Sequence, residues 1–134
     1  MVLRRVGSDY NRTVVKKDKD NLYVFTDNGD RTSGKGKIPD DSEYSKRFGK
    51  TNLCYPTKTS AVLRGLENSC PITTQKRYIP GVRSHMGNWT DDDFEEFKKV
   101  IDEDFEFIKK QCVDKKYKIV YFPKDGVLNG TISR

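Results

Sequence analysis

Three short apolar runs along the chain predict β-strands, and each run leads into polar residues. Residues 22–26 begin with four consecutive apolar or aromatic side chains, which is typical of a strand covered on both faces in the middle of a sheet. Residues 117–122 (YKIVYF) form a second strong run, and residues 71–75 (PITTQ) form a shorter one. We expect these three segments to be strands, with hydroxyl, amide and charged groups where each strand ends.

The segment 91–112 predicts an amphipathic helix. Its apolar residues recur at spacings of three and four, so they form a single stripe that we expect to pack against the sheet. The stripe consists of Phe94, Phe97, Ile101, Phe105, Ile108 and Cys112. Thr90 and Asp93 have the spacing of a capping box, and Trp89 and Phe94 have that of a hydrophobic staple around it.

Two other segments have weaker patterns of apolar and polar residues. Residues 57–66 predict a short helix, and Gly65 either ends this helix or lets the backbone pass close to a neighbouring segment. Residues 1–20 predict an N-terminal arm or an edge strand, with Val14 and Val15 as possible strand residues.

The order of these elements is strand, short helix, strand, long helix, strand, which predicts an α/β fold. A long helix between two strands is the crossover that parallel pairing requires. We therefore predict a small three-layer α/β fold with a largely parallel sheet, formed as a single domain by residues 21–134.

Length and composition narrow the class of protein. At 134 residues the chain suits one domain, and because hydrophobic and charged residues are equally frequent (34% each), its core must be lean and its surface very polar. No apolar run is long enough to span a bilayer, and no apolar segment of a signal peptide follows the basic N-terminus. Cys54, Cys70 and Cys112 are widely spaced without a C-x-x-C pair, which argues against a disulfide framework and a zinc knuckle. We expect a cytoplasmic protein.

Charge is unevenly distributed along the chain. The net charge is +6, but residues 90–112 contain nine acidic and four basic residues, which leaves +11 on the remainder. A cationic body beside one acidic helix predicts that the body binds an anionic ligand. The alternative is that these charges only solvate the surface.

The loop that follows the first strand has the chemistry of an anion site. It is rich in glycine, hydroxyl, amide and cationic groups, and the carboxyl ends of strands are where open α/β sheets bind ligands. Gly29, Gly34 and Lys35 match the spacing of a phosphate-binding P-loop, but Gly36 stands where a magnesium-binding Ser or Thr belongs. This excludes an ordinary ATPase. A cationic loop that contacts phosphate or ribose remains one reading, and an ordinary solvated loop is the other.

Several segments together resemble a family of small tailed-phage proteins. They are YVFTDNGDRTSG, PTKTSAVLRGLENSCPITTQ, NWTDDDFEEFKKVIDEDFEFIK and PKDGVLNGTIS, within residues 21–134. Relatives in that family pair a strand ending in Gly-Asp-Asn with a Gly-Gly-Gln-Ala loop and a late Asp-Gly-x-Gly-Thr-Gly turn. These marks are similar to those of macrodomains, three-layer α/β folds that bind ADP-ribose-like ligands in strand-end loops, so the resemblance implies a macrodomain-like fold.

The family's marks are only partly kept in this chain. Asp27 and Asn28 match the first mark, and the late turn keeps Asp125 and Gly126. Lys58-Thr59-Ser60 replaces the Gly-Gly-Gln stretch, and this departure argues against the close backbone approach to a pyrophosphate that glycine allows.

The leading hypothesis is a phage-type accessory protein that binds a nucleotide-like anion. The resemblance implies the phage context and a ligand of the ADP-ribose or cyclic-nucleotide class, which we expect to be a host defence signal that the protein sequesters in the host cytoplasm. We expect cations to meet phosphates, while carboxylate, amide and hydroxyl groups contact ribose or base. The candidate ligand-binding residues are Thr26, Asp27, Asn28, Arg31, Lys35, Lys58, Thr59, Arg64, Thr73, Thr74, Lys76, Asp125, Gly126 and Asn129.

Two further hypotheses belong to other classes. A hydrolase of the same ligand would use Asp27 or Asp125 as general base, but no carboxylate pair, metal-ligand cluster or activated nucleophile stands out, and the single histidine, His85, is in a predicted loop. We therefore expect binding rather than catalysis, with no metal and no cofactor. The third hypothesis is an inhibitor that binds nucleic acid or a host protein, since tyrosines are interleaved with the cations.

Overall fold

The computed structural model describes residues 2–6, 11–28, 35–37, 52–55, 63–76 and 89–123. In chain order its elements are β1 (Val2–Val6), α1 (Arg12–Lys17), β2 (Asn21–Asn28), β3 (Lys35–Lys37), β4 (Asn52–Tyr55), β5 (Ser69–Gln75), the 3-10 helix η3 (Asp91–Asp93), α3 (Phe94–Lys115) and β6 (Ile119–Pro123). No helix in these residues combines the length and the apolar character needed to cross a membrane.

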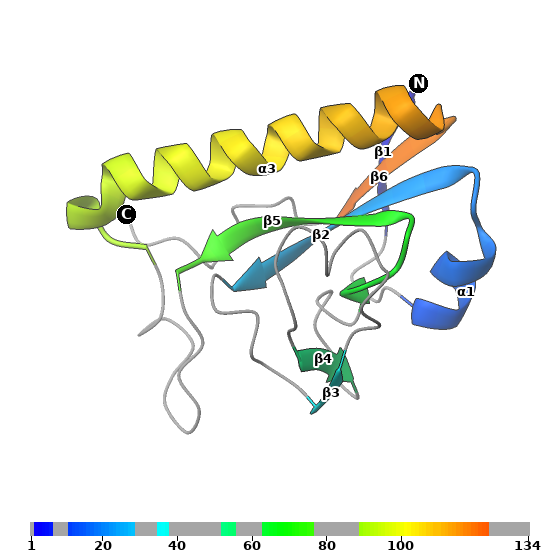
Figure 1. Cartoon of the computed structure of the whole chain (residues 1–134), viewed down its shortest axis with the longest axis horizontal. Helices are drawn as coiled ribbons and strands as arrows, with labels where there is room; N and C mark the ends of the chain where they lie inside the picture. Colours follow the sequence, from blue (N-terminus) through cyan, green and yellow to red (C-terminus); the bar gives the residue numbers. More distant parts are fainter. Residues whose placement is uncertain are drawn as a thin grey trace.

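Four strands form one parallel sheet in the order β1-β6-β2-β5, and β3 and β4 pair separately as a two-stranded antiparallel ribbon. The three strands predicted from the sequence correspond to β2, β5 and β6, which are neighbours in this sheet (Figure 1). The predicted α/β fold with a parallel sheet is therefore confirmed. The segment that was predicted as an arm or edge strand contributes β1 at the sheet edge beside β6.

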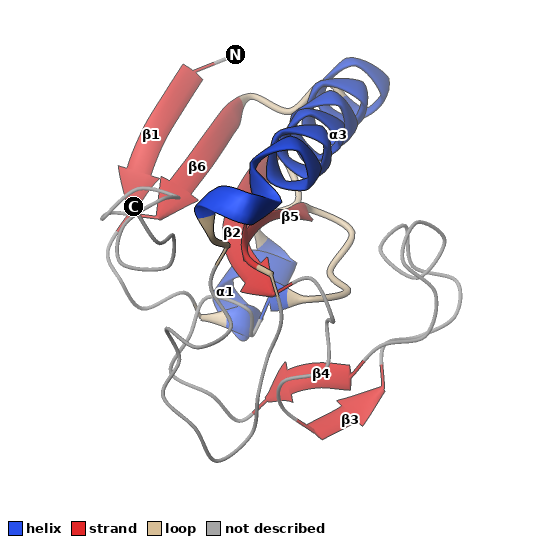
Figure 2. Cartoon of the chain, turned by 90° about the vertical axis from the view of Figure 1, so that its left-hand side faces the viewer, coloured by secondary structure: helices blue, strands red, loops and turns tan. Residues whose placement is uncertain are grey.

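Helix α3 lies along one face of the sheet, over β2 and β5, while α1 lies on the opposite side of these strands (Figures 1 and 2). The core between α3 and the sheet is one apolar cluster, made of Leu22, Val24, Cys70, Ile72, Ile108, Tyr117 and Val120. Strand side chains alternate between faces, so the intervening residues of β2 point toward α1. There the ring of Tyr23 stacks on that of Tyr121, with centroids 4.7 Å apart.

The long helix forms as predicted, but its buried face is rotated. The Thr90 and Asp93 capping box is present, and α3 continues past the predicted end to Lys115. Phe94 is 59% exposed and Phe105 is 39% exposed, whereas Asp104 and Gln111 are buried, so the predicted apolar stripe is wrong at these positions. The buried Trp89 packs against the ring of Phe97, with ring centroids 5.4 Å apart, whereas Phe94, its predicted partner in the staple, is largely exposed.

Two weaker predictions need correction. Val14 and Val15 belong to helix α1 rather than to a strand, with Val15 buried and Val14 exposed. Of the predicted helix at 57–66, residues 57–62 lie outside the described part of the chain, and residues 63–66 form a tight turn. Gly65 has φ 87°, which glycine adopts without steric cost, and it lies within this turn.

The amino ends of the strands are joined by neutral side-chain amides. The Nδ2 group of Asn68 donates to the carbonyl oxygens of Val15 (2.8 Å), Asp18 (3.0 Å) and Asn21 (3.2 Å). Asn21 in turn accepts from the backbone N–H of Ile119 at 3.1 Å. These contacts attach the end of α1 to β2 and β6, and so they set the position of α1 beneath the sheet.

Candidate functional site

The carboxyl ends of β2 and β5 form the edge of the sheet where the sequence predicts a ligand site. The two strands are adjacent and parallel, and Asp27 pairs in register with Thr73. The register shifts between Asp27 and Asn28, so the ladder becomes irregular where β2 ends. Loops leave both strands on the same edge, which is the position of ligand sites in open α/β sheets.

Asp27 forms a buried ion pair with Arg64 at this edge. The guanidinium binds the carboxylate through two parallel contacts, Arg64 Nε to Asp27 Oδ2 at 3.1 Å and Arg64 Nη2 to Asp27 Oδ1, and both side chains are 0% exposed. Arg64 comes from the turn before β5, and its carbonyl oxygen accepts from Arg12 Nη1 at 2.7 Å. Two residues that the sequence suggested as ligand contacts are therefore bonded to each other, and the pair connects β2, α1 and the turn.

Thr73 is fixed at the outer edge of β5 by Asp104, for which the sequence predicted no role, and by Trp89, which was predicted only as part of a hydrophobic staple. Its backbone N–H donates to Asp104 Oδ2 at 2.8 Å, and its carbonyl oxygen accepts from Trp89 Nε1 at 3.0 Å. All three residues are buried. Since β5 is an edge strand, these side chains satisfy backbone groups that would otherwise be unpaired. An aspartate between the apolar positions 101 and 108 was the available signal for this role.

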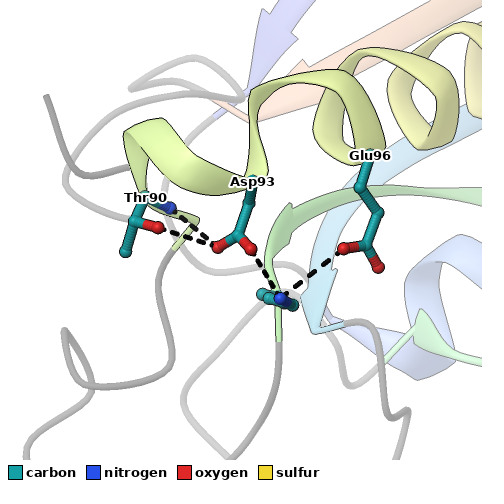
Figure 3. Close-up of polar contacts among 4 residues, drawn as sticks. Thr90, Asp93 and Glu96 are labelled. Carbon is teal, nitrogen blue, oxygen red and sulfur yellow. Dashed lines mark hydrogen bonds and ion pairs between the residues drawn. The ribbon is translucent and has the colours of Figure 1, made fainter.

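Lys76 follows directly after β5 and is held by two carboxylates. Its ammonium group lies 2.6 Å from Asp93 Oδ1 and 3.5 Å from Glu96 Oε2 (Figure 3), and 6.0 Å from the centre of the Trp89 ring. The hydrogen bond with Asp93 raises the pKa of Lys76, and the same bond, together with the backbone N–H of Thr90, lowers the pKa of Asp93. The Lys76 side chain remains 24% exposed, so this cation is accessible from solvent.

The other candidate residues divide into two groups. Thr26 and Asn28 lie in β2, Lys35 lies in β3, and Thr74 is buried in β5. The candidates outside the described residues are Arg31, Lys58, Thr59, Asp125, Gly126 and Asn129. The structure thus brings Asp27, Arg64, Thr73, Thr74 and Lys76 to one edge of the sheet.

At this edge Asp27 is not placed to act as a general base. A general base must reach the proton that it removes, whereas Asp27 is fully buried with both oxygens on Arg64. Within the described ranges, no group of three or more His, Cys, Asp or Glu side chains is placed to hold a metal ion. Lys76 is a charged group that an incoming anion could reach, and two carboxylates position its ammonium group.

Comparison with known proteins places the chain in one family. No curated protein and no solved structure matches it. The model of a family of unknown function (DUF7831) matches residues 6–133, which include every strand and helix described above except the first residues of β1. The chain therefore belongs to this family of unknown function, DUF7831.

Proposed function

We propose that the protein binds a nucleotide-like anionic ligand, of the ADP-ribose or cyclic-nucleotide class, at the carboxyl edge of β2 and β5. The observation that carries the proposal is the convergence of polar groups from separate segments at this edge: Asp27 from β2, Arg64 from the turn, and Thr73 and Lys76 from the end of β5. Adjacent parallel strands that end together leave room for a ligand beyond their ends.

The described residues have two different roles in this proposal. The buried pair of Asp27 and Arg64 is a fixed support, which holds the end of β2 at this edge. Lys76 is the contact with the ligand, because it is partly exposed and lies at the edge itself. A phosphate oxygen would take the place of one of its carboxylate partners, which keeps the cation charge-paired throughout.

The wider context is part of the same proposal. A three-layer, macrodomain-like arrangement would place the ligand in strand-end loops, and a phage-type accessory protein in the host cytoplasm would then sequester a nucleotide defence signal. The parallel order of β6, β2 and β5, with helices on both sides, supports this arrangement.

Calorimetry tests the proposal directly. The protein is titrated with ADP-ribose, its cyclic isomers and cyclic dinucleotides, and at least one of them is expected to bind with an affinity that falls as salt is raised. Lys76→Ala should weaken binding about tenfold or more, because it removes a charge-assisted hydrogen bond. The matched control is Lys118→Ala, which removes an exposed cation before β6, at the opposite end of the strands. The absence of heat with every nucleotide, or equal losses in both variants, would reject the site.

A further inference from the structure

A second cationic surface lies on α1, on the other side of the sheet from α3 (Figure 2). An open depression of about 690 Å³ is lined, among the described residues, by Arg12, Thr13, Lys16, Lys17 and Lys19. We call this set the α1 basic surface. It shares no residue with the candidate site at the carboxyl edge. Because β2 rises ~3.3 Å per residue, the start of β2, next to Lys19, is ~20 Å from Asp27.

The lysines of this surface carry no counter-charge in the described part of the chain. Lys16, Lys17 and Lys19 are all exposed and make no ion pair there. The two neighbouring aspartates, Asp18 and Asp20, bond to other residues. Asp18 accepts from Asn21 Nδ2 at 2.9 Å and from the Tyr23 hydroxyl at 2.8 Å, and Asp20 faces Lys118 at 4.0 Å.

The fold holds this surface in place. Arg12 donates to the carbonyl oxygen of Arg64, Val15 is buried, and Asn68 binds the carbonyl oxygens of Val15 and Asp18. Burial lowers the pKa of Arg12. Stabilisation of the helix C-terminus accounts for lysines in the last turn, namely Lys16 and Lys17, but not for Lys19, which lies beyond the helix.

Charge is also separated across the sheet. The segment 90–112, which contains most of α3, has nine acidic and four basic residues, and α3 and α1 lie on opposite sides of β2 and β5. A polyanion is therefore attracted to the side of α1 and repelled from the side of α3.

We propose that the α1 basic surface binds the phosphodiester backbone of nucleic acid. The described lining consists of cations and one hydroxyl, which are groups that contact phosphate oxygens. It includes no aromatic residue on which a base could stack and no carboxylate or amide that could read a base edge. Because the described lining offers cations for phosphate oxygens, binding should depend steeply on salt.

The experiment measures the anisotropy of a fluorescent 20-base-pair DNA duplex with the full chain at several salt concentrations. In the test variant, Lys16, Lys17 and Lys19 are all changed to Gln, which removes three charges at similar helix propensity. The plot of log K against log salt has a negative slope, and each lost phosphate contact makes it less steep by about 1. The magnitude of the slope should therefore be smaller by about 2 to 3 in the test variant. Affinity at 0.1 M salt should fall on the order of 100-fold.

The matched control changes Lys98, Lys99 and Lys110 to Gln. These lysines are also exposed and unpaired in the described part of the chain, they lie on α3, and their removal makes the same change in net charge. The control should keep the slope of the unmodified protein. Equal losses in both variants would show attraction by net charge alone and would reject the site, as would an unchanged test variant or an absence of DNA binding. Nucleotide calorimetry on the test variant should be unaffected, which separates this surface from the carboxyl-edge site.

Discussion

The two ends of the parallel sheet are held together by different chemistry. At the amino end, Asn68 and Asn21 make hydrogen bonds to backbone groups, without a net charge on either side chain, and the ion pair of Lys118 with Asp20 there is long (4.0 Å) and exposed to solvent. At the carboxyl end, a carboxylate meets a cation at each of two neighbouring strands, Asp27 with Arg64 and Asp93 with Lys76. Neutral amides keep their hydrogen bonds at any ordinary pH, whereas ion pairs respond to pH, to salt and to competing ions.

The carboxyl end is itself divided by exposure to solvent. Asp27 and Arg64 are both 0% exposed, while Lys76 retains 24% of its side-chain surface. Burial makes the first pair costly to break, because a remaining partner would be an uncompensated charge in the interior. Solvent screens the second pair and lets an anion compete for the cation. We therefore expect the fold to depend on the first pair, and the second is the pair at which the proposed ligand would compete for the cation.

Breaking the buried pair should have the largest effect on stability. Asp27→Ala leaves the Arg64 guanidinium buried without its carboxylate, so the free energy of unfolding should fall by ~3–5 kcal/mol. Urea denaturation followed by circular dichroism measures this change, with the slope against urea expected to stay constant if the native state is otherwise kept.

A double variant separates the cost of a stranded charge from the value of the pair. In Asp27→Leu with Arg64→Met neither charge remains, so it should be more stable than Asp27→Ala even though more atoms are changed. If Asp27→Ala lies within about 1 kcal/mol of the unmodified protein, the pair does not hold the edge, and the contrast between buried and exposed pairs is lost.

At the neutral end of the sheet, the expected effect is smaller. Asn68→Ala removes the donor shared by three carbonyl oxygens, which should cost ~1–3 kcal/mol. Asn68→Asp has nearly the same volume but places an acceptor against those carbonyls, so it should be at least as destabilising. If Asn68→Asp is more stable than Asn68→Ala in the same urea experiment, the side-chain amide of Asn68 has the opposite orientation.

The strands could be predicted because a strand that is buried on both faces appears in the sequence as an unbroken run of apolar residues. The unbroken apolar run at 22–25 and the run at 117–122 lie within or overlap β2 and β6. The long helix between β5 and β6 indicated that these two strands run parallel, as they do on either side of β2. The phase of α3 could not be predicted from apolar spacing alone. Asp104 is turned inward because the edge of β5 needs an acceptor, and this rotation leaves Phe105 partly exposed.

The sequence predicted where the candidate site lies, but it did not predict which residues of the site bond to one another. The polar strand ends indicated the edge to which Asp27, Thr73 and Lys76 belong. The partners of these residues come from elsewhere in the chain, since Arg64 is 37 positions from Asp27 and Asp93 is 17 positions from Lys76. Contacts over such separations depend on the register of the sheet and the approach of α3, which single-sequence patterns do not encode.

The exposed pair should give the smallest effect, and one that depends on pH. Lys76 lowers the pKa of Asp93 below its ordinary value of 3.8, so the pair's contribution is present above that pH and is lost as pH falls through the lowered pKa. The pKa of Lys76 is raised above 10.5, so on the alkaline side the contribution is lost only as pH rises through that raised value. Asp93→Asn should therefore lower Tm slightly near neutral pH, and the difference from the unmodified protein should shrink as the pH falls below 3.8 and through the lowered pKa of Asp93. Thermal melts across this range measure the difference, with Lys76→Met and the double variant completing a thermodynamic cycle. A coupling energy near zero between positions 76 and 93 in this cycle would assign the effect to the Thr90 cap, whose backbone N–H donates to Asp93 Oδ2 at 3.1 Å, rather than to the ion pair.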